Sequence, residues 1–193
     1  MLTLYFAPGS SSMAVHIALH EIGAKFESRP LSFARKETRQ TEFLKLNPQG
    51  QVPVLVADGR VLTEVAAILF YLAKTFPEAK LLPEGGLAVE AEAISWMSFL
   101  AAHVHLSRWR GVETAREMFG LADRRLGSKD WALGTYSIAD IHLFRLFWRN
   151  RAFLKAEAGG FANLVRHHER MMARAAVKKT IEVEAAIGYE LPA

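Results

Sequence analysis

The first 75 residues alternate between short apolar runs and helical stretches, and this order limits the possible folds more than any other feature of the chain. Apolar and helical periodicities predict strands at 2–6, 26–31, 54–57 and 61–63, and helices at 11–22, 36–46 and 64–75. Asp58-Gly59 separates the last two strands closely enough for a hairpin, whereas the earlier strands are separated by helices and need crossover connections. The predicted order is therefore β-α-β-α-β-β-α.

The pattern changes near residue 80. Prolines and glycines interrupt it at Pro77, Pro83, Gly85 and Gly86, and only helical periodicity follows to about residue 186. With 193 residues, of which 51% are hydrophobic, the chain can bury a sizeable core. We expect an α/β domain over 1–78, a linker over 79–86 and an all-helical domain over 87–193.

Composition excludes several chemistries. The chain has no cysteine, so it has no disulfide framework, no zinc-thiolate site and no thiolate nucleophile of its own. The longest apolar stretches, such as 65–73, fall short of the roughly 20 residues that cross a bilayer, and the N-terminus lacks a secretory pattern. We therefore expect a cytoplasmic protein without a membrane partner.

Charge patterning points away from nucleic acid. The net charge is +4, and a local basic series recurs every four residues at Arg166, Arg170, Arg174 and Lys178. This spacing predicts one helical face, and no aromatic interleaving or nucleic-acid motif accompanies it. We interpret the face as solvated and predict no nucleic-acid partner.

Ser10, Ser11 and Ser12 stand where the first strand passes into a helix. Unpaired amides and the helix dipole make such a position an anion site, whereas helix capping alone would use one hydroxyl. Both interpretations stay open for these three residues.

A second loop, Asn47-Pro48-Gln49-Gly50, leads into Val52-Pro53 at the start of a strand. Proline cannot donate to a sheet ladder, and an X-Pro bond there can be cis, which would turn the Val52 amide and carbonyl outward to bind an extended peptide. Glu64 then opens the next helix and offers a carboxylate beside free amides. Together they suit the α-amino acid end of a ligand.

Other motifs favour structural roles. Ser137-Ile-Ala-Asp140 predicts a capping box, in which a hydroxyl and a carboxylate satisfy helix amides reciprocally. His16 and His20 are four residues apart, but no further ligand pattern surrounds them, so we predict packing roles and no metal site.

The segments "NPQGQVPVL", "TEVAAI" and "SIAD" together resemble the glutathione transferase family over essentially the whole chain. This implies a thioredoxin-like domain followed by a helical domain. The opening "LYFAPGSSSMAVHIALHEIG" and the later "WMSFLAAHVH" are similar to the bacterial beta class, in which a cysteine normally stands where this chain has Ser11. The resemblance therefore makes disulfide exchange an unexpected activity here.

The resemblance also implies a set of glutathione contacts. Val52, beside Gln51 and Pro53, would bind the cysteinyl backbone, and Glu64 with the Val65 amide would bind the γ-glutamyl end. Lys36 matches a glutathione-contacting lysine, with Arg35 as the alternative cation. In the helical domain, His105 matches a histidine facing the thiol and Ser98 matches an asparagine near the ligand.

The implied activity is conjugation of glutathione, as co-substrate, to small hydrophobic electrophiles by a homodimeric enzyme. Ser11 is the first candidate donor to the thiol, Ser10 the second, and Tyr5 the third, because tyrosine-type relatives place a donor at the end of this strand. His103 and His105 are about 200° apart around a helix, so one of them at most faces the site, and we favour His105. The alternatives are a non-catalytic binding or regulatory protein and a glutathione-dependent isomerase or dehalogenase.

Overall fold

The computed structural model describes residues 1–156 and 159–191, and these form two compact units. The first unit comprises residues 1–72 and 175–193, and the second comprises 73–174. Within the described residues, no helix is long and apolar enough to cross a membrane.

A four-stranded sheet forms the centre of the first unit. The strands of the described chain are β1 (Leu2–Phe6), β2 (Phe26–Pro30), β3 (Val54–Ala57) and β4 (Arg60–Thr63). Their order is β2-β1-β3-β4, with β1 parallel to β2 and antiparallel to β3, and β4 completing the predicted hairpin. This order brings the end of β1 beside the start of β3, where Tyr5 pairs with Val54.

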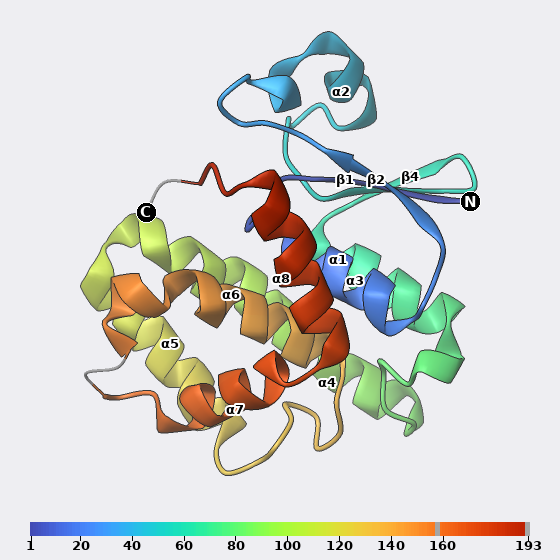
Figure 1. Cartoon of the computed structure of the whole chain (residues 1–193). Helices are drawn as coiled ribbons and strands as arrows, with labels where there is room; N and C mark the ends of the chain where they lie inside the picture. Colours follow the sequence, from blue (N-terminus) through green and yellow to red (C-terminus); the bar gives the residue numbers. More distant parts are fainter. Residues whose placement is uncertain (157–158, 192–193) are drawn as a thin grey trace. The chain divides into compact units, whose positions relative to one another are not determined.

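Helices cover both faces of this sheet. The helices of the unit are α1 (Ser12–Glu21), α2 (Thr41–Leu46), α8 (Ala175–Ile187) and the start of α3 (Val65–Thr75). Figure 1 shows α1 and α3 on one face and α2 on the other. Side chains from both layers, such as Phe6, Ile17 and Ile68, are fully buried and form the core.

One predicted helix is wrong in detail. Residues 36–46 form a short 3₁₀ turn, Glu37–Arg39, and then α2, because Gln40 between them is extended at φ −73° and ψ 146°. Lys36 precedes the turn in the left-handed region at φ 53°. The apolar spacing of this segment therefore predicted the helical content but not the break.

The second unit is helical. Its described helices are the end of α3, α4 (Gly86–Phe99), α5 (Val112–Leu126), α6 (Ile138–Leu154) and α7 (Ala162–Met172), with 3₁₀ turns at Pro77–Ala79 and Arg108–Arg110. A π-helical segment, Leu100–His105, continues α4. The core contains Trp96, Phe119, Leu143 and Phe147. The predicted capping box is confirmed at the start of α6.

The division differs from the expected domain boundaries at the C-terminus. Helical periodicity placed residues 175–193 in the helical domain, but α8 packs on α1 of the first unit. The predicted basic face is also interrupted, because α7 ends at Met172 and Lys178 lies on α8. Arg170 is paired with Asp130 at 2.6 Å.

Candidate functional site

The three serines before α1 have different environments. Ser12 is fully buried, and its Oγ donates to the Ala7 carbonyl and accepts from the Ala7 amide, both at 3.1 Å. Ser10 is also buried, with its Oγ 2.6 Å from the Ser12 Oγ and 3.3 Å from the Ser12 amide, from which it accepts. Ser11 makes no side-chain cap, and its Oγ donates to the Val52 carbonyl at 3.0 Å. The printed bonds of Ser10 and Ser12 thus lie within this loop, and the Ser11 hydroxyl reaches the second loop.

Asn47 shapes that second loop. Its buried side chain donates to the Gln51 carbonyl at 2.8 Å and accepts from the Gln49 amide at 3.1 Å. Gly50 has φ +64°, and a Cβ there would lie 2.7 Å from the Thr38 carbonyl oxygen, so the turn requires glycine. These contacts fix the backbone of the turn that immediately precedes Val52.

The Val52-Pro53 peptide bond is cis, which confirms the prediction. The Val52 side chain is buried among apolar residues, and its carbonyl accepts from Ser11. No acceptor for the Val52 amide lies among the residues that the structure describes. This backbone therefore retains a hydrogen-bond donor for an extended ligand.

Tyr5 lies in the same region of the first unit. It is half-buried on β1, opposite Val54, and its ring centroid is 6.0 Å from that of Phe43. It packs against the apolar cluster that contains Val52. Tyr5 is therefore near the predicted ligand backbone, but its ring is also part of the core.

Glu64 lies between β4 and α3, and Val65 is the first residue of α3. Glu64 has φ 67° and an exposed side chain, and its carbonyl accepts from the Ile68 amide at 3.0 Å. No cation pairs with its carboxylate among the residues placed in the structure. Because Val65 begins the helix, its amide is one of the four that lack an intrahelical acceptor. The Glu64 carboxylate therefore precedes a helix amide without an intrahelical acceptor by one residue.

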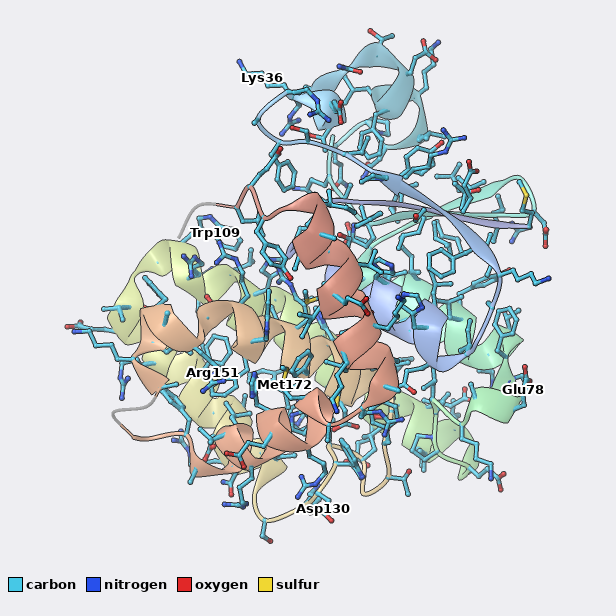
Figure 2. All side chains as sticks on the ribbon, in the orientation of Figure 1. Lys36, Glu78, Trp109, Asp130, Arg151 and Met172 are labelled. Atoms are coloured by element: carbon cyan, nitrogen blue, oxygen red, sulfur yellow. The ribbon has the colours of Figure 1, made fainter. Side chains whose placement is uncertain are left out.

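The two candidate cations, Arg35 and Lys36, differ in whether they pair with a carboxylate of the described chain. The Arg35 Nε donates to the Glu37 Oε1 at 2.9 Å, and this hydrogen bond raises the pKa of the guanidinium. Lys36 is exposed, and Figure 2 shows its side chain projecting away from the ribbon. Within the described residues its ammonium has no carboxylate partner. Among the described residues, the Arg35 guanidinium is thus already paired with a carboxylate and the Lys36 ammonium is not.

In the second unit, His105 ends the π-helical segment and Ser98 is exposed on α4. The His105 ring is 5.3 Å from that of Trp109, whereas His103 is exposed beside Phe99. Burial, with a smaller effect from Arg145, lowers the pKa of His105 to about 4. The imidazole is consequently uncharged at neutral pH.

His142 on α6 is a buried histidine that the sequence did not single out. Among the described residues neither of its ring nitrogens has a hydrogen-bond partner, and burial, then His105 and Arg145, lower its pKa to about 3. Because the unfolded chain binds the proton at a higher pH, the free energy of unfolding is expected to fall as pH drops below 6.5 toward 3.

We expect His142→Leu to reduce the slope of the free energy of unfolding against pH by about 1.4 kcal/mol per pH unit between pH 6 and 4. The reason is that the variant takes up one fewer proton on unfolding. Urea denaturation of both proteins at pH 7, 6, 5 and 4 measures the difference. Parallel pH dependences would contradict a buried, neutral His142.

Ser12 and Asn47 were named from the sequence, but neither of them was assigned a supporting role. Ser12 holds Ala7, and Asn47 holds the turn before Val52. Neither residue type is distinctive in this setting, since serine and asparagine are common in turns. Their hydrogen bonds only become visible in the folded loops.

The chain is similar to known proteins along most of its length. Residues 1–74 match the family model "Glutathione S-transferase, N-terminal domain", and residues 99–175 match "Glutathione S-transferase, C-terminal domain". A glutathione S-transferase of Xanthomonas campestris pv. campestris is 31% identical over 95% of this chain and 98% of its own length. A maleylacetoacetate isomerase of Rhizobium meliloti is 37% identical over 63% of this chain and 56% of its own length.

Solved structures are similar over the whole fold. A sphingomonad glutathione S-transferase complexed with glutathione has a TM-score of 0.85 at 30% identity, covering 95% of this chain and 98% of that one. The bacterial beta-class glutathione S-transferase of Sphingomonas chungbukensis has a TM-score of 0.84 at 32% identity, covering 94% of this chain and 98% of that one.

Proposed function

The chain belongs to the glutathione S-transferase family of enzymes, and from this premise we propose that it binds glutathione as a thiolate for attack on small hydrophobic electrophiles. The observation that carries the proposal is the meeting of two loops in the first unit. There, the Ser11 hydroxyl lies 3.0 Å from the Val52 carbonyl, and the Val52 amide is left for a ligand. A hydroxyl beside a peptide-binding backbone suits the cysteinyl residue of glutathione.

Each end of glutathione has a proposed partner in the same unit. Glu64 offers its carboxylate to the γ-glutamyl ammonium, and the Val65 amide offers a donor to the carboxylate of the same residue. Val52 offers its amide to the cysteinyl carbonyl, next to Pro53 and Gln51. Lys36 offers a cation to the remaining carboxylate, while Arg35 is engaged by Glu37.

Lowering the pKa of a thiol from about 8.5 to near 7 requires about 2 kcal/mol. A hydrogen bond to a charged sulfur contributes about 1.5–3 kcal/mol, from which about 0.5–1.5 is lost when the Ser11 hydroxyl leaves the Val52 carbonyl. The N-terminus of α1 adds about 0.3–1 kcal/mol. The midpoints of these ranges sum to about 1.9 kcal/mol, so Ser11 with the helix terminus would lower the thiol pKa by about 1.4 units.

Ser10 is less suited to this role, because its hydroxyl is buried against Ser12. Tyr5 stays a second candidate for the donor to the thiol, because it packs against the apolar cluster that contains Val52. We assign His105 a neutral hydrogen-bonding role, since its lowered pKa leaves no charge to stabilise a thiolate. Ser98 stays a proposed contact from α4.

We also propose that the protein is a homodimer. Leu87 and Ile94 support this, because both expose apolar side chains on α4, seven residues apart. Measuring the mass of the protein in solution tests this proposal.

The test combines binding and turnover. Calorimetry with glutathione, followed by conjugation assays on several aryl and alkyl electrophiles, should show both binding and transfer. Binding without turnover would favour a non-catalytic binding protein, and no binding would refute the ligand assignment. The similarity to a maleylacetoacetate isomerase supports a second candidate, glutathione-dependent isomerisation, which the same preparation tests with a cis-enone diacid.

The choice between the two cations gives a specific prediction. We expect Lys36→Ala to raise the KM for glutathione about two- to fivefold, the effect of one exposed ion pair. Arg35→Ala is the matched control and should change KM less than twofold, because its guanidinium already binds Glu37. The reverse ranking in steady-state kinetics would exclude Lys36 as the ligand contact.

A further inference from the structure

His142 on α6 has hydrogen-bonding capacity that the described chain does not use. Its side chain is 1% exposed, and neither ring nitrogen has a partner among the described residues. A neutral imidazole carries one N–H donor and one acceptor nitrogen, and buried polar groups in folded proteins nearly always have partners. The ring is thus suited to a partner that comes from outside the chain.

Two further groups of the second unit lie around this ring. Arg145 is buried on α6, three residues after His142 and therefore on the same side of the helix. His105 ends the π-helical segment, which packs against α6, and such segments occur frequently at functional sites. After burial, which has the largest effect, His105 and Arg145 lower the pKa of His142, and Arg145 lowers the pKa of His105. The charge beside both rings is positive, so the partner that they favour is an anion.

The outer side of this group is aromatic. Trp109, labelled in Figure 2, is 70% exposed, and its ring centroid lies 5.3 Å from that of the half-buried His105. An indole face stacks readily on another aromatic ring. Exposure decreases from Trp109 through His105 to His142, and in the same order an aromatic surface gives way to hydrogen-bond donors and a positive charge. A ligand that matches this order has an aromatic body and an acid group.

We propose that the helical unit selects an electrophile with an aromatic body and a carboxylate, with the body stacked on Trp109 and the carboxylate accepting from His142 and Arg145. His105 lies between these two ends of the ligand. A guanidinium has five N–H donors, so Arg145 can bind a carboxylate oxygen in addition to other partners. The reaction of such an electrophile rests on the proposed function, whereas binding of the acid uses residues of the second unit alone.

Chloronitrobenzoate, with chlorine para and the nitro group meta to the carboxylate, is a suitable electrophile of this class. The glutathione thiolate attacks the ring carbon that carries chlorine. The C–S bond forms, the C–Cl bond breaks, and chloride leaves with the bonding electron pair, while the thiol proton has already passed to solvent. The carboxylate takes no part in these bonds. Its contribution is therefore measured by comparison with the chloronitrobenzamide of the same substitution pattern, which is uncharged.

Binding is tested first without glutathione, by calorimetry at neutral pH with naphthoate and naphthamide as probes. We expect the unaltered chain to bind naphthoate at least about tenfold more tightly than naphthamide. His142→Leu should reduce this preference about five- to tenfold, because a hydrogen bond to a charged acceptor contributes more than one to a neutral amide. His103→Leu is the matched control and should leave the preference unchanged, since His103 is an exposed histidine on the same π-helical segment as His105. Equal affinity of the unaltered chain for the two probes would overturn the inference, and so would an unchanged preference in His142→Leu.

Trp109→Ala covers the case in which His142→Leu does not fold, because the Trp109 side chain is exposed and its removal leaves the core intact. The variant should bind both probes about three- to tenfold more weakly, since stacking does not depend on the acid group. Its preference for naphthoate should remain. Unchanged affinity for both probes would overturn the place of the aromatic body on Trp109.

Turnover then connects the acid group with the reaction. Each rate is divided by that of the uncatalysed reaction with glutathione, because the two electrophiles differ in reactivity. We expect kcat/KM for chloronitrobenzoate to exceed that for chloronitrobenzamide at least about tenfold, and His142→Leu to reduce this ratio about five- to tenfold. A ratio near one in the unaltered enzyme would overturn the acid group as a determinant of the electrophile. Failure of the unaltered chain to bind glutathione would instead overturn the proposed function, and the preference for naphthoate does not depend on it.

Discussion

Replacing Asp140 by alanine is expected to lower the free energy of unfolding by about 3–5 kcal/mol, the range for breaking a buried charged interaction. The side chain is fully buried at the start of α6. Its Oδ2 accepts from the amide and hydroxyl of Ser137, both at 2.9 Å, and its Oδ1 accepts from the Ala132 amide at 2.8 Å. The Nε2 of His167 lies 3.0 Å from Oδ1. Alanine would leave these buried groups without their acceptor.

Urea denaturation followed by circular dichroism measures this loss. Asp130→Ala is the matched control, because Asp130 is an exposed carboxylate paired with Arg170 and should contribute less than about 1 kcal/mol. Equal destabilisation by the two substitutions would show that Asp140 acts only as a surface cap. The prediction concerns the stability of the helical unit and does not depend on the proposed ligand.

Ser11→Ala is expected to raise the pKa of the bound glutathione thiol by about one unit. At pH values below the thiol pKa of the unaltered protein, kcat should then fall about tenfold, because the thiolate fraction falls by that factor. The net contribution of the hydroxyl is reduced because it gives up the Val52 carbonyl to reach the sulfur. The N-terminus of α1 remains in the variant and keeps part of the shift. Thiolate absorbance of the complex as a function of pH measures the pKa directly.

Ser10→Ala and Tyr5→Phe test the alternatives to Ser11. We expect Ser10→Ala to affect stability more than the thiol pKa, because the Ser12 hydroxyl loses its neighbour at 2.6 Å. Tyr5→Phe keeps the ring contact with Phe43 and removes only the phenolic hydroxyl. An unchanged thiol pKa in Ser11→Ala, with a raised one in Tyr5→Phe, would transfer the donor role to Tyr5.

Short-range patterns predicted much of the fold. The strand and helix order of the first 75 residues, the hairpin at Asp58-Gly59 and the capping box of Ser137 and Asp140 are all confirmed. Each depends on residues within a few positions of one another, so periodicity and turn chemistry are sufficient. The Val52-Pro53 bond is cis, as the sequence allowed, since the bond before a proline is the place where a cis peptide costs little.

Candidate site residues could be named from the sequence, but the sequence could not show which of several similar residues fills each role. Ser10, Ser11 and Ser12 are chemically equivalent in a linear chain, and Arg35 and Lys36 are both cations. The folded loops distinguish them: Ser11 reaches Val52, and Arg35 is bound to Glu37. Which donor remains available depends on neighbours that folding brings together.

The sequence alone was sufficient for the order of elements in the first 75 residues, the capping box of α6 and the family, since each depends on short local patterns. The tertiary structure was needed to show that α8 belongs with the sheet and that Glu184 accepts from the Gly9 amide, 175 positions away. Helical periodicity shows that a helix has an apolar face, but it does not identify the surface that buries it. A carboxylate needs hydrogen-bond donors from the protein only when folding removes it from water. Those donors can come from segments far away in the sequence, which meet the carboxylate only when the segments pack together.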